Sequence, residues 1–380
     1  MTALEPVPEH TVDPRTLCTN CIEPSTGPYC PKCGWRRGDR ASSPIYLPPG
    51  SILHSGQDQY LVGKVLGHGG FGITYLGYDP NLRKKVAIKE YFPSGVAIRD
   101  GSVATVRPLS KGVQPHYASG LERFLEEART VRKLRNHVNI VRVENLFPAN
   151  GTAYLVMEHL DGVTFLDYLK KRGGKTDWAT LMRVMMPVLD ALREVHHHAF
   201  LHRDISPDNI YLLRSGIVKV IDFGAARQSL GHASKNVSAV FKGGYTPPEQ
   251  YQERGHQGPW TDIYAAAATM YRALTGVMPP SAPDRMLGTA LKAPRDLGAS
   301  MEPVHEQALM QALRVEAPRR FQTVGAFQNA LRVEAKSAAG TPAVSATAAA
   351  SGVPKWALPA AVAAILVLAM MVFEYSGVRF

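Results

Sequence analysis

Apolar residues recur with a steady period from about position 60 to about position 334, and this pattern divides the chain. Before it, residues 1–57 are rich in Pro, Gly and polar side chains. After it, residues 336–354 are mainly Ala, Ser, Thr, Gly and Pro, a composition typical of flexible linkers. The pattern therefore predicts one large folded domain at 58–335, followed by a linker at 336–354.

Within the domain, the spacing of apolar residues predicts both strands and helices. Residues 60–78 indicate a strand, a glycine-rich turn and a second strand, and apolar alternation at 86–89 indicates another strand. Helical periodicity marks residues 121–134. Two further apolar runs, 154–160 and 217–221, are expected to be strands.

Residues 357–373 carry no charged or strongly polar side chain. As a helix this run would measure roughly 26 Å, close to the roughly 30 Å hydrocarbon core of a bilayer. Trp356 and Tyr375 flank it, as interfacial aromatic residues do. The run predicts a transmembrane helix at 355–375, and a buried helix of the folded domain is the alternative.

The overall charge adds little to this picture. The 380-residue chain has a formal net charge of +11, and 45% of its residues are hydrophobic, as in globular proteins. Its basic residues are spread along the chain without a Lys/Arg run, so nucleic acid is not expected as a partner. A nucleic-acid regulator that works through the N-terminal region is kept as an alternative, and a mild attraction to anionic lipid headgroups would suit the C-terminal helix.

All four cysteines lie near the N-terminus, in two C-x2-C motifs separated by eight residues. Two such turns can place four thiolates at the corners of a tetrahedron, which is the usual structural site for Zn²⁺. Residues 29–34 also resemble a zinc-ribbon knuckle. We therefore expect a zinc ribbon at 15–40, with iron or a redox pair as alternatives, and its ligands would be Cys18, Cys21, Cys30 and Cys33.

Four further motifs follow in a fixed order along the predicted domain. They are Gly67-His-Gly-Gly-Phe-Gly72, Val86-Ala-Ile-Lys89, His202-Arg-Asp204 with Asn209, and Asp222-Phe-Gly224. Each one alone is a weak signal, but the ordered set is the signature of protein kinases. Over about 275 of its 380 residues, the chain resembles bacterial eukaryotic-like serine/threonine protein kinases.

This resemblance implies an α+β, bilobal protein-kinase fold, with a small antiparallel-sheet lobe and a larger helical lobe, preceded by the zinc ribbon. It also implies an ATP site between the lobes. A buried ion pair between Glu249 and Arg320 is expected, and Asp262 should brace the catalytic loop. The histidines at 196–198 are expected to end a helix rather than to bind metal.

The resemblance assigns a role to each motif residue. Asp204 would accept or orient the proton of the substrate hydroxyl, and Lys89 would pair with the ATP phosphates while Glu127, rather than Glu126, holds it. The expected ATP-binding residues are Gly67, Gly69, Gly72, Lys89, Met157, Glu158 and Leu160, and the expected Mg²⁺ ligands are Asn209 and Asp222.

Two positions depart from the family pattern. Ser206 stands where a lysine is usual, two residues after Asp204, and Lys242 stands where a threonine is usual. We expect the Lys242 ammonium to reach the γ-phosphate and to replace the missing donor. The alternative is a solvent-facing loop lysine that recognises acidic substrates.

Together, these features predict a membrane-anchored protein kinase that transfers the ATP γ-phosphate to Ser/Thr hydroxyls of proteins, including its own. A membrane-tethered pseudokinase scaffold is the alternative. The expected partners are ATP, Mg²⁺, protein substrates and the bilayer, and a homodimer would serve autophosphorylation. We expect a single-pass protein of the bacterial inner membrane with its kinase domain in the cytosol.

Overall fold

The computed structural model describes residues 16–39, 41–99, 104–223, 242–252 and 255–333. The chain divides into one unit that comprises Met1–Ala335 and a second that comprises Lys336–Phe380. The predicted linker and transmembrane helix belong to the second unit and lie outside the described residues. Within the described ranges, no helix is both long and apolar enough to cross a membrane.

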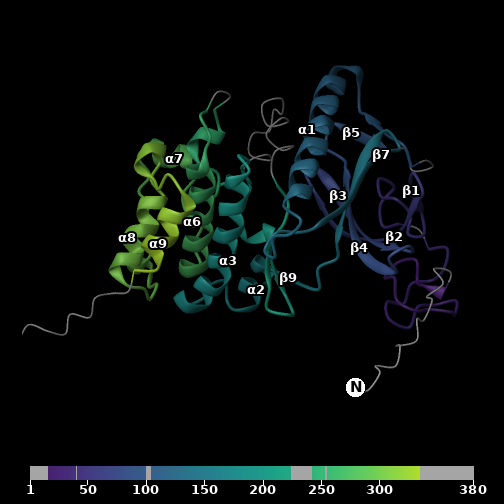
Figure 1. The fold of residues 1–380 in the computed structure, drawn as a ribbon, viewed down its shortest axis with the longest axis horizontal. Coiled ribbons are helices and arrows are strands. Elements are labelled where there is room, and N and C mark those ends of the chain that lie inside the picture. Colours follow the sequence, from purple (N-terminus) through teal and green to yellow (C-terminus); the bar gives the residue numbers. More distant parts are fainter. Residues whose placement is uncertain (1–15, 40, 100–103, 224–241, 253–254, 334–380) are drawn as a thin grey trace, which may run out of the picture. The chain divides into compact units, whose positions relative to one another are not determined.

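The first lobe is built on an antiparallel sheet of six strands in the order β1-β2-β3-β4-β8-β7 (Figure 1). Each pair of neighbouring strands is antiparallel. The sheet begins before the predicted domain boundary at 58, because β1 pairs with β2. The strands are β1 (Ile52–Ser55), β2 (Asp58–Gly69), β3 (Gly72–Asp79), β4 (Lys84–Tyr91), β7 (Val143–Ala149) and β8 (Thr152–Glu158).

One long helix, α1 (Gln114–Lys133), packs on this sheet (Figure 1). Its buried face includes Phe124, Ala128 and Val131, which are the periodic apolar positions of the sequence. The helix begins earlier than the predicted 121, because a turn with Pro115 near the N-terminus starts it. A small hairpin of β5 (Ala97–Arg99) and β6 (Val106–Pro108) precedes α1.

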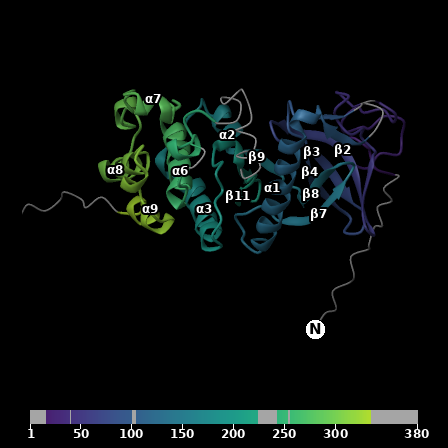
Figure 2. The same cartoon turned by 90° about the horizontal axis from the view of Figure 1, so that it is seen from above.

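The second lobe is mainly helical (Figure 2). Its central helix α6 is buried on nearly every side, and α3 and α8 pack against it. The helices are α2 (Phe165–Lys171), α3 (Trp178–His197), α6 (Pro259–Thr275), α7 (Ala282–Met286), α8 (Pro303–Ala312) and α9 (Val324–Leu331). The bilobal fold expected from the resemblance is therefore confirmed.

A small sheet in the order β11-β10-β9 carries the loops that matter most for the site. Its strands are β9 (Gly162–Thr164), β10 (Ile210–Leu213) and β11 (Val218–Val220). Short 3-10 helices complete the unit, namely η2 (Lys111–Val113), η3 (Pro207–Asn209), η4 (Pro248–Gln250), η5 (Arg295–Leu297) and η6 (Ala317–Arg319).

Candidate active site

Two adjoining cavities contain every candidate residue of the kinase motifs. The first, of about 410 Å³, is lined by Gly67, Gly69, Gly72, Lys89, Glu127, Asp204, Asn209, Asp222 and Lys242. The second, of about 390 Å³, is lined by Met157, Glu158 and Leu160, together with apolar side chains such as Leu66, Ala87 and Ile221. Gly67, Thr74 and Asp222 line both cavities, so the two form one site.

An ion pair joins the two lobes within this site. Lys89 lies on β4, and its Nζ atom is 2.7 Å from Oδ1 of Asp222, which follows β11. Asp222 has a φ of 57°, a conformation that non-glycine residues rarely adopt. Such strain is common where a side chain must be aimed at a ligand, and here it accompanies a carboxylate at the cavity wall.

The structure separates the two glutamates that the sequence could not separate. Glu127 is buried on α1 and lines the first cavity together with Lys89. Glu126 is exposed, because adjacent residues on a helix point about 100° apart. Glu127 is thus the glutamate that lies at the cavity, and its pairing with Lys89 stays a prediction.

The catalytic loop is held by backbone and side-chain hydrogen bonds. Asn209 Nδ2 donates to both the carbonyl oxygen and Oδ2 of Asp204, each at 2.7 Å. Asp262, which is fully buried, accepts from the N–H groups of His202 at 2.9 Å and Arg203 at 2.7 Å. The predicted bracing role of Asp262 is therefore confirmed.

The electrostatics of this loop follow from its burial. Burial opposes the ionisation of Asp262, but the hydrogen bond and charge of His196 outweigh it and hold the pKa of Asp262 below its usual value. His196 lies in the last turn of α3 as expected, and its Nε2 atom is 2.7 Å from Oδ2 of Asp262. Burial lowers the pKa of His202, so its neutral ring can donate from Nε2 to the Ile221 carbonyl and accept at Nδ1 from the Asp204 N–H.

Lys242 lines the first cavity together with the glycine-rich turn. Its Nζ atom is 2.7 Å from Ser206 Oγ, 3.5 Å from Asp204 Oδ2 and 3.8 Å from Asp208 Oδ2. The structure thus brings together the two positions at which the sequence departs from the family pattern.

A second ion pair stabilises the helical lobe away from the cavity. Arg320 contacts both carboxylate oxygens of Glu249, at 2.8 and 3.1 Å, and both side chains are buried. Thr261 Oγ1 also donates to Glu249 at 2.9 Å. The expected structural pair is confirmed.

The sequence analysis missed a buried network beside the site. Glu90 follows Lys89 on β4 and points to the other face of the sheet, where it is fully buried and pairs with Arg99. The hydroxyls of Tyr154 and Tyr75 donate to Glu90 at 2.8 and 3.1 Å. A buried carboxylate on a strand is usually paired, so strand alternation could have indicated that Glu90 has a cationic partner, but not which residue it is.

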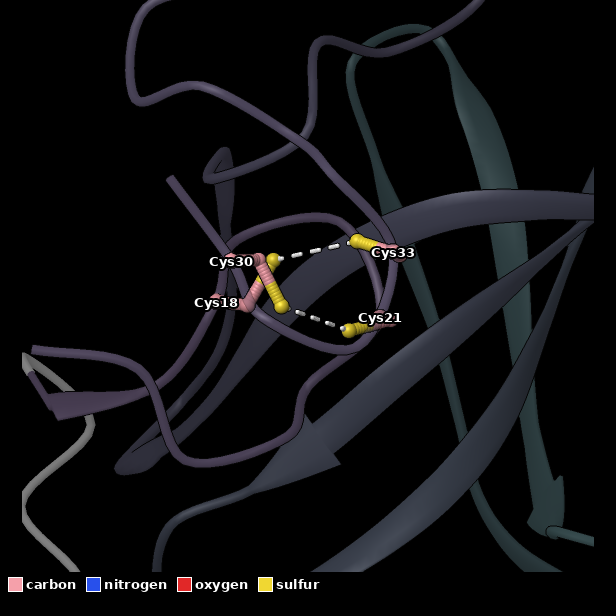
Figure 3. Close-up of side chains that lie close together, drawn as sticks. All are labelled: Cys18, Cys21, Cys30 and Cys33. Atoms are coloured by element: carbon pink, nitrogen blue, oxygen red, sulfur yellow. Dashed lines mark hydrogen bonds between the residues drawn. The ribbon is translucent and has the colours of Figure 1, made fainter. Parts of the chain in front are cut away.

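The four cysteines form a second cluster, shown in Figure 3. Their sulfur atoms all lie within 4.8 Å of one another, with Cys18–Cys33 at 3.7 Å and Cys21–Cys30 at 3.5 Å. Four thiolates bound to one zinc ion at about 2.3 Å are spaced about 3.8 Å apart, so these residues fit a tetrahedral metal site.

Backbone N–H groups at the cluster favour the thiolate form of Cys30, whereas burial raises the pKa of Cys18. The Asn20 N–H lies 3.4 Å from the sulfur of Cys18, and its side-chain amide lies 3.6 Å from that of Cys33. Desolvation opposes ionisation of Cys30, but the N–H groups of Cys33 and Lys32 lower its pKa to about 6. Burial raises the pKa of Cys21, which a bound cation would reverse.

The cysteine region packs on the sheet of the first lobe (Figure 1). The Lys64 N–H donates to the Asn20 carbonyl at 2.8 Å, and Lys85 pairs with Glu23 at 2.7 Å. A Cβ atom at Gly63 would lie only 2.8 Å from the same carbonyl, so a glycine is needed for this approach. The apolar contact comprises Leu17 and Ile22 with Leu61, Leu76 and Tyr78.

Comparisons with known proteins agree with this geometry. Residues 60–293 match the family described as protein kinase domain. The chain is 30% identical over 345 residues to serine/threonine-protein kinase Pkn1 of Myxococcus xanthus, covering 82% of this chain and 46% of that protein. It is 34% identical over 242 residues to tyrosine-protein kinase MasK of Myxococcus xanthus (strain DK1622), covering 58% of this chain and 37% of that protein. The chain thus spans less than half the length of these relatives.

Two solved structures are also similar. The apo form of PpkA-294 has a TM-score of 0.68 and 31% identity, over 76% of this chain and 99% of that one. The PknI kinase domain of M. tuberculosis has a TM-score of 0.56 and 22% identity, over 75% of this chain and 98% of that one, a likeness of fold alone.

Proposed function

Because this chain belongs to the protein kinase family, we propose that it transfers the γ-phosphoryl group of ATP to serine or threonine hydroxyls of proteins, including its own. One observation carries this proposal. The Lys89–Asp222 pair and the Asp204–Asn209 pair line one cavity together with the glycine-rich turn, although they come from three separate segments. Phosphoryl transfer needs positioning and charge neutralisation, and this set of side chains supplies both.

Each side chain has a distinct task in the transfer. The substrate hydroxyl oxygen forms a new bond to the γ-phosphorus, and the bond to the bridging oxygen breaks so that ADP leaves with the electron pair. Asp204 takes the hydroxyl proton, and Lys89 holds the α- and β-phosphates. The carboxylate of Asp222 and the amide oxygen of Asn209 suit a hard cation, and a bound Mg²⁺ would neutralise phosphate charge there.

The second cavity suits adenine. Met157 and Leu160 provide apolar walls, together with Ala87 on the neighbouring strand β4. The carboxylate of Glu158 is held by Lys219 at 2.7 Å, and its N–H donates to the Arg142 carbonyl at 3.0 Å. Recognition of adenine at Glu158 would therefore use the backbone carbonyl oxygen.

The decisive experiment is phosphate transfer from labelled ATP by the purified full chain, followed by analysis of the modified residue. Phosphoserine or phosphothreonine is expected, with loss in Asp222→Ala. Phosphotyrosine alone would contradict the Ser/Thr assignment, a relevant outcome since a similar protein is named a tyrosine kinase. ATP binding without any transfer would favour the pseudokinase scaffold instead.

The four cysteines are proposed to hold a structural zinc ion. The region has no large apolar core of its own, so metal binding would supply much of its folding free energy. Metal analysis of the purified protein should find about one zinc per chain. A finding of one iron per chain, with visible absorption from thiolate-to-iron charge transfer, would show that the site holds iron instead of zinc.

The segment 355–375 is proposed as a single-pass anchor in the bacterial inner membrane, with the kinase domain on the cytosolic side. Its apolar sequence supports this proposal. The full chain should sediment with membranes, whereas a chain that lacks 355–380 should stay in the supernatant and keep its activity. A full chain found wholly in the supernatant would contradict the anchor. Autophosphorylation in trans would indicate at least a transient homodimer.

A further inference from the structure

The ammonium of Lys242 occupies an acidic corner of the first cavity. It contacts Ser206 and lies 3.5 Å from the carboxylate of Asp204, the expected proton acceptor. Asp208, at 3.8 Å, adds a second negative charge. Of the described residues that line this cavity, the lysines are Lys89 and Lys242, and they come from opposite lobes.

After Arg203, the neighbouring catalytic loop contributes no cation to this corner. Residues 204–209 contain two carboxylates and the uncharged, fully buried Ser206, and no lysine or arginine. A transferring phosphoryl group that reaches Asp204 would meet the negative charges of Asp204 and Asp208 there. Apart from a Mg²⁺ ion held by Asn209 and Asp222, Lys242 would supply the positive charge at this corner from the protein itself.

The backbone of Lys242 is anchored, so its side chain is not a loosely placed surface lysine. Its carbonyl accepts from the N–H groups of Tyr245 and Thr246 at 3.1 and 3.2 Å. Gly244, with a φ of 83°, packs so closely that a Cβ atom would lie 2.7 Å from the Pro279 carbonyl. This turn is therefore fixed against the helical lobe, and about a quarter (26%) of the Lys242 side chain is exposed.

We propose that Lys242 is a catalytic residue whose ammonium donates hydrogen bonds to the phosphoryl group during transfer. This proposal rests on the kinase function proposed above. In the structure, the ammonium is held by Ser206 and the two carboxylates. When the γ-phosphate enters, its oxygens accept from the same ammonium, while the bonds form and break as described and the hydroxyl proton passes to Asp204. An ammonium placed to donate to the phosphoryl oxygens in the geometry of transfer stabilises the transition state more than bound ATP, so its effect falls on the chemical step.

The main experiment compares Lys242→Met with the wild type in single-turnover phosphoryl transfer by the full chain. The wild type must first transfer phosphate, and if it does not, the proposed function itself fails. With an active wild type, the variant should transfer about 100-fold more slowly or worse, as for the loss of one transition-state donor. ATP affinity should change by less than about threefold. The matched control is Lys171→Met, an exposed lysine in the last turn of α2, which should keep the wild-type rate.

A second readout does not depend on turnover. ADP with magnesium and aluminium fluoride mimics the transferring phosphoryl group, and calorimetry measures its binding. Lys242→Met should weaken this binding by about the factor by which the transfer rate falls, and should leave binding of ADP alone unchanged. Equal binding of the mimic by both proteins would overturn the proposal.

A rescue experiment separates catalysis from a purely structural role. Adding Ser206→Lys to Lys242→Met returns an ammonium to the same corner from the catalytic loop. It should recover at least tenfold of the lost rate. No recovery, together with a wild-type affinity for the aluminium fluoride complex, would overturn the proposal. So would a Lys242→Met protein whose only defect is a higher KM for acidic acceptors, because that result assigns Lys242 to substrate recognition.

Discussion

The cysteine cluster and the kinase cavity gather reactive side chains in opposite ways. The four cysteines lie within residues 18–33, and their neighbours form no large core. The cavity draws Lys89, Glu127, Asp204 and Asp222 from distant segments, and a continuous apolar core runs beneath them. With the proposed metal bound, the cysteines would hold the local fold in the first case, whereas in the second case the fold holds the functional side chains in place.

This difference predicts where a substitution acts. A residue whose position is set by the core can be replaced at the cost of function alone. Where metal binding takes the place of an apolar core, a metal ligand cannot be changed without loss of local structure. The apolar contact of Leu17 and Ile22 with the sheet joins the cysteine region to the first lobe. It therefore determines how far a loss of structure in one of them affects the other.

The largest effect is expected for Asp222→Ala. The rate of phosphoryl transfer should fall at least about 10³-fold, because Asp222 is the expected Mg²⁺ ligand and positions charge for the reaction. The melting temperature should change by less than about 3 °C, measured by calorimetry, since the side chain is partly exposed. Asp161→Ala, which removes an exposed carboxylate paired with Arg214, should leave the rate unchanged. If the loss of rate in Asp222→Ala came from unfolding, the kinase cavity would not differ from the cysteine cluster in the way proposed.

The next effect is expected for Cys30→Ser. Bound metal should fall from about one to well below half an equivalent, measured by elemental analysis, because a hydroxyl is a poor zinc ligand. Protease cleavage within residues 16–39 should accelerate about tenfold or more, while most of the transfer activity remains. Thr26→Ala, an exposed change in the same segment, serves as the control. Loss of activity equal to that of Asp222→Ala would mean that the ribbon is part of the active site.

A smaller effect is expected for Leu17→Ala, which removes a buried side chain from the contact between ribbon and sheet. Truncation of a buried leucine lowers the free energy of unfolding by about 2–5 kcal/mol. Here the loss should appear as separation of the cysteine region from the sheet. Amide hydrogen exchange should rise in β2 and β3, with metal still bound. Leu82→Ala, at an exposed leucine, should leave exchange unchanged. Global unfolding in Leu17→Ala would show that the ribbon belongs to the core.

The smallest effect is expected for Glu23→Gln, which breaks the pair with Lys85. A partly exposed pair contributes about 0.2–1 kcal/mol to the free energy of unfolding. The hydrogen bond from Lys85 lowers the pKa of Glu23 in the folded protein. Its contribution is therefore complete above the unfolded value of 4.5 and is lost as the pH falls through the lowered folded value. Denaturant unfolding at pH 7 and pH 3 should show a larger difference between wild type and variant at pH 7 than at pH 3, and a smaller difference in high salt.

The sequence predicted much of the site because short motifs carry it. Lys89, Asp204, Asn209 and Asp222 each lie in a run of residues whose local chemistry is recognisable, and the structure places all four at one cavity. Helical periodicity could not separate Glu126 from Glu127, because both neighbours fit an amphipathic helix until its packing partner is known.

Other features depend on contacts between segments that lack any shared pattern. The docking residues Leu17 and Ile22 lie in a loop-rich segment without periodicity, so no sequence signal indicated that they are buried. The ion pair of Glu90 with Arg99 joins β4 to the short hairpin of β5 and β6. Burial of a carboxylate can be inferred from strand alternation, but the identity of its cation cannot.

The buried network around Arg99 has a consequence for how this chain could have evolved. Arg99 donates to the Ile45 carbonyl, and the Leu47 N–H donates to the Tyr75 hydroxyl at 3.1 Å. Leu47 is itself 1% exposed, so this residue of the stretch that leads from the cysteine region to the sheet is part of the core of the first lobe. A gene fusion that exchanged everything before residue 58 would remove these partners from Arg99 and Tyr75. Residues 45–57 and the kinase domain are therefore expected to be inherited together, as one unit of recombination.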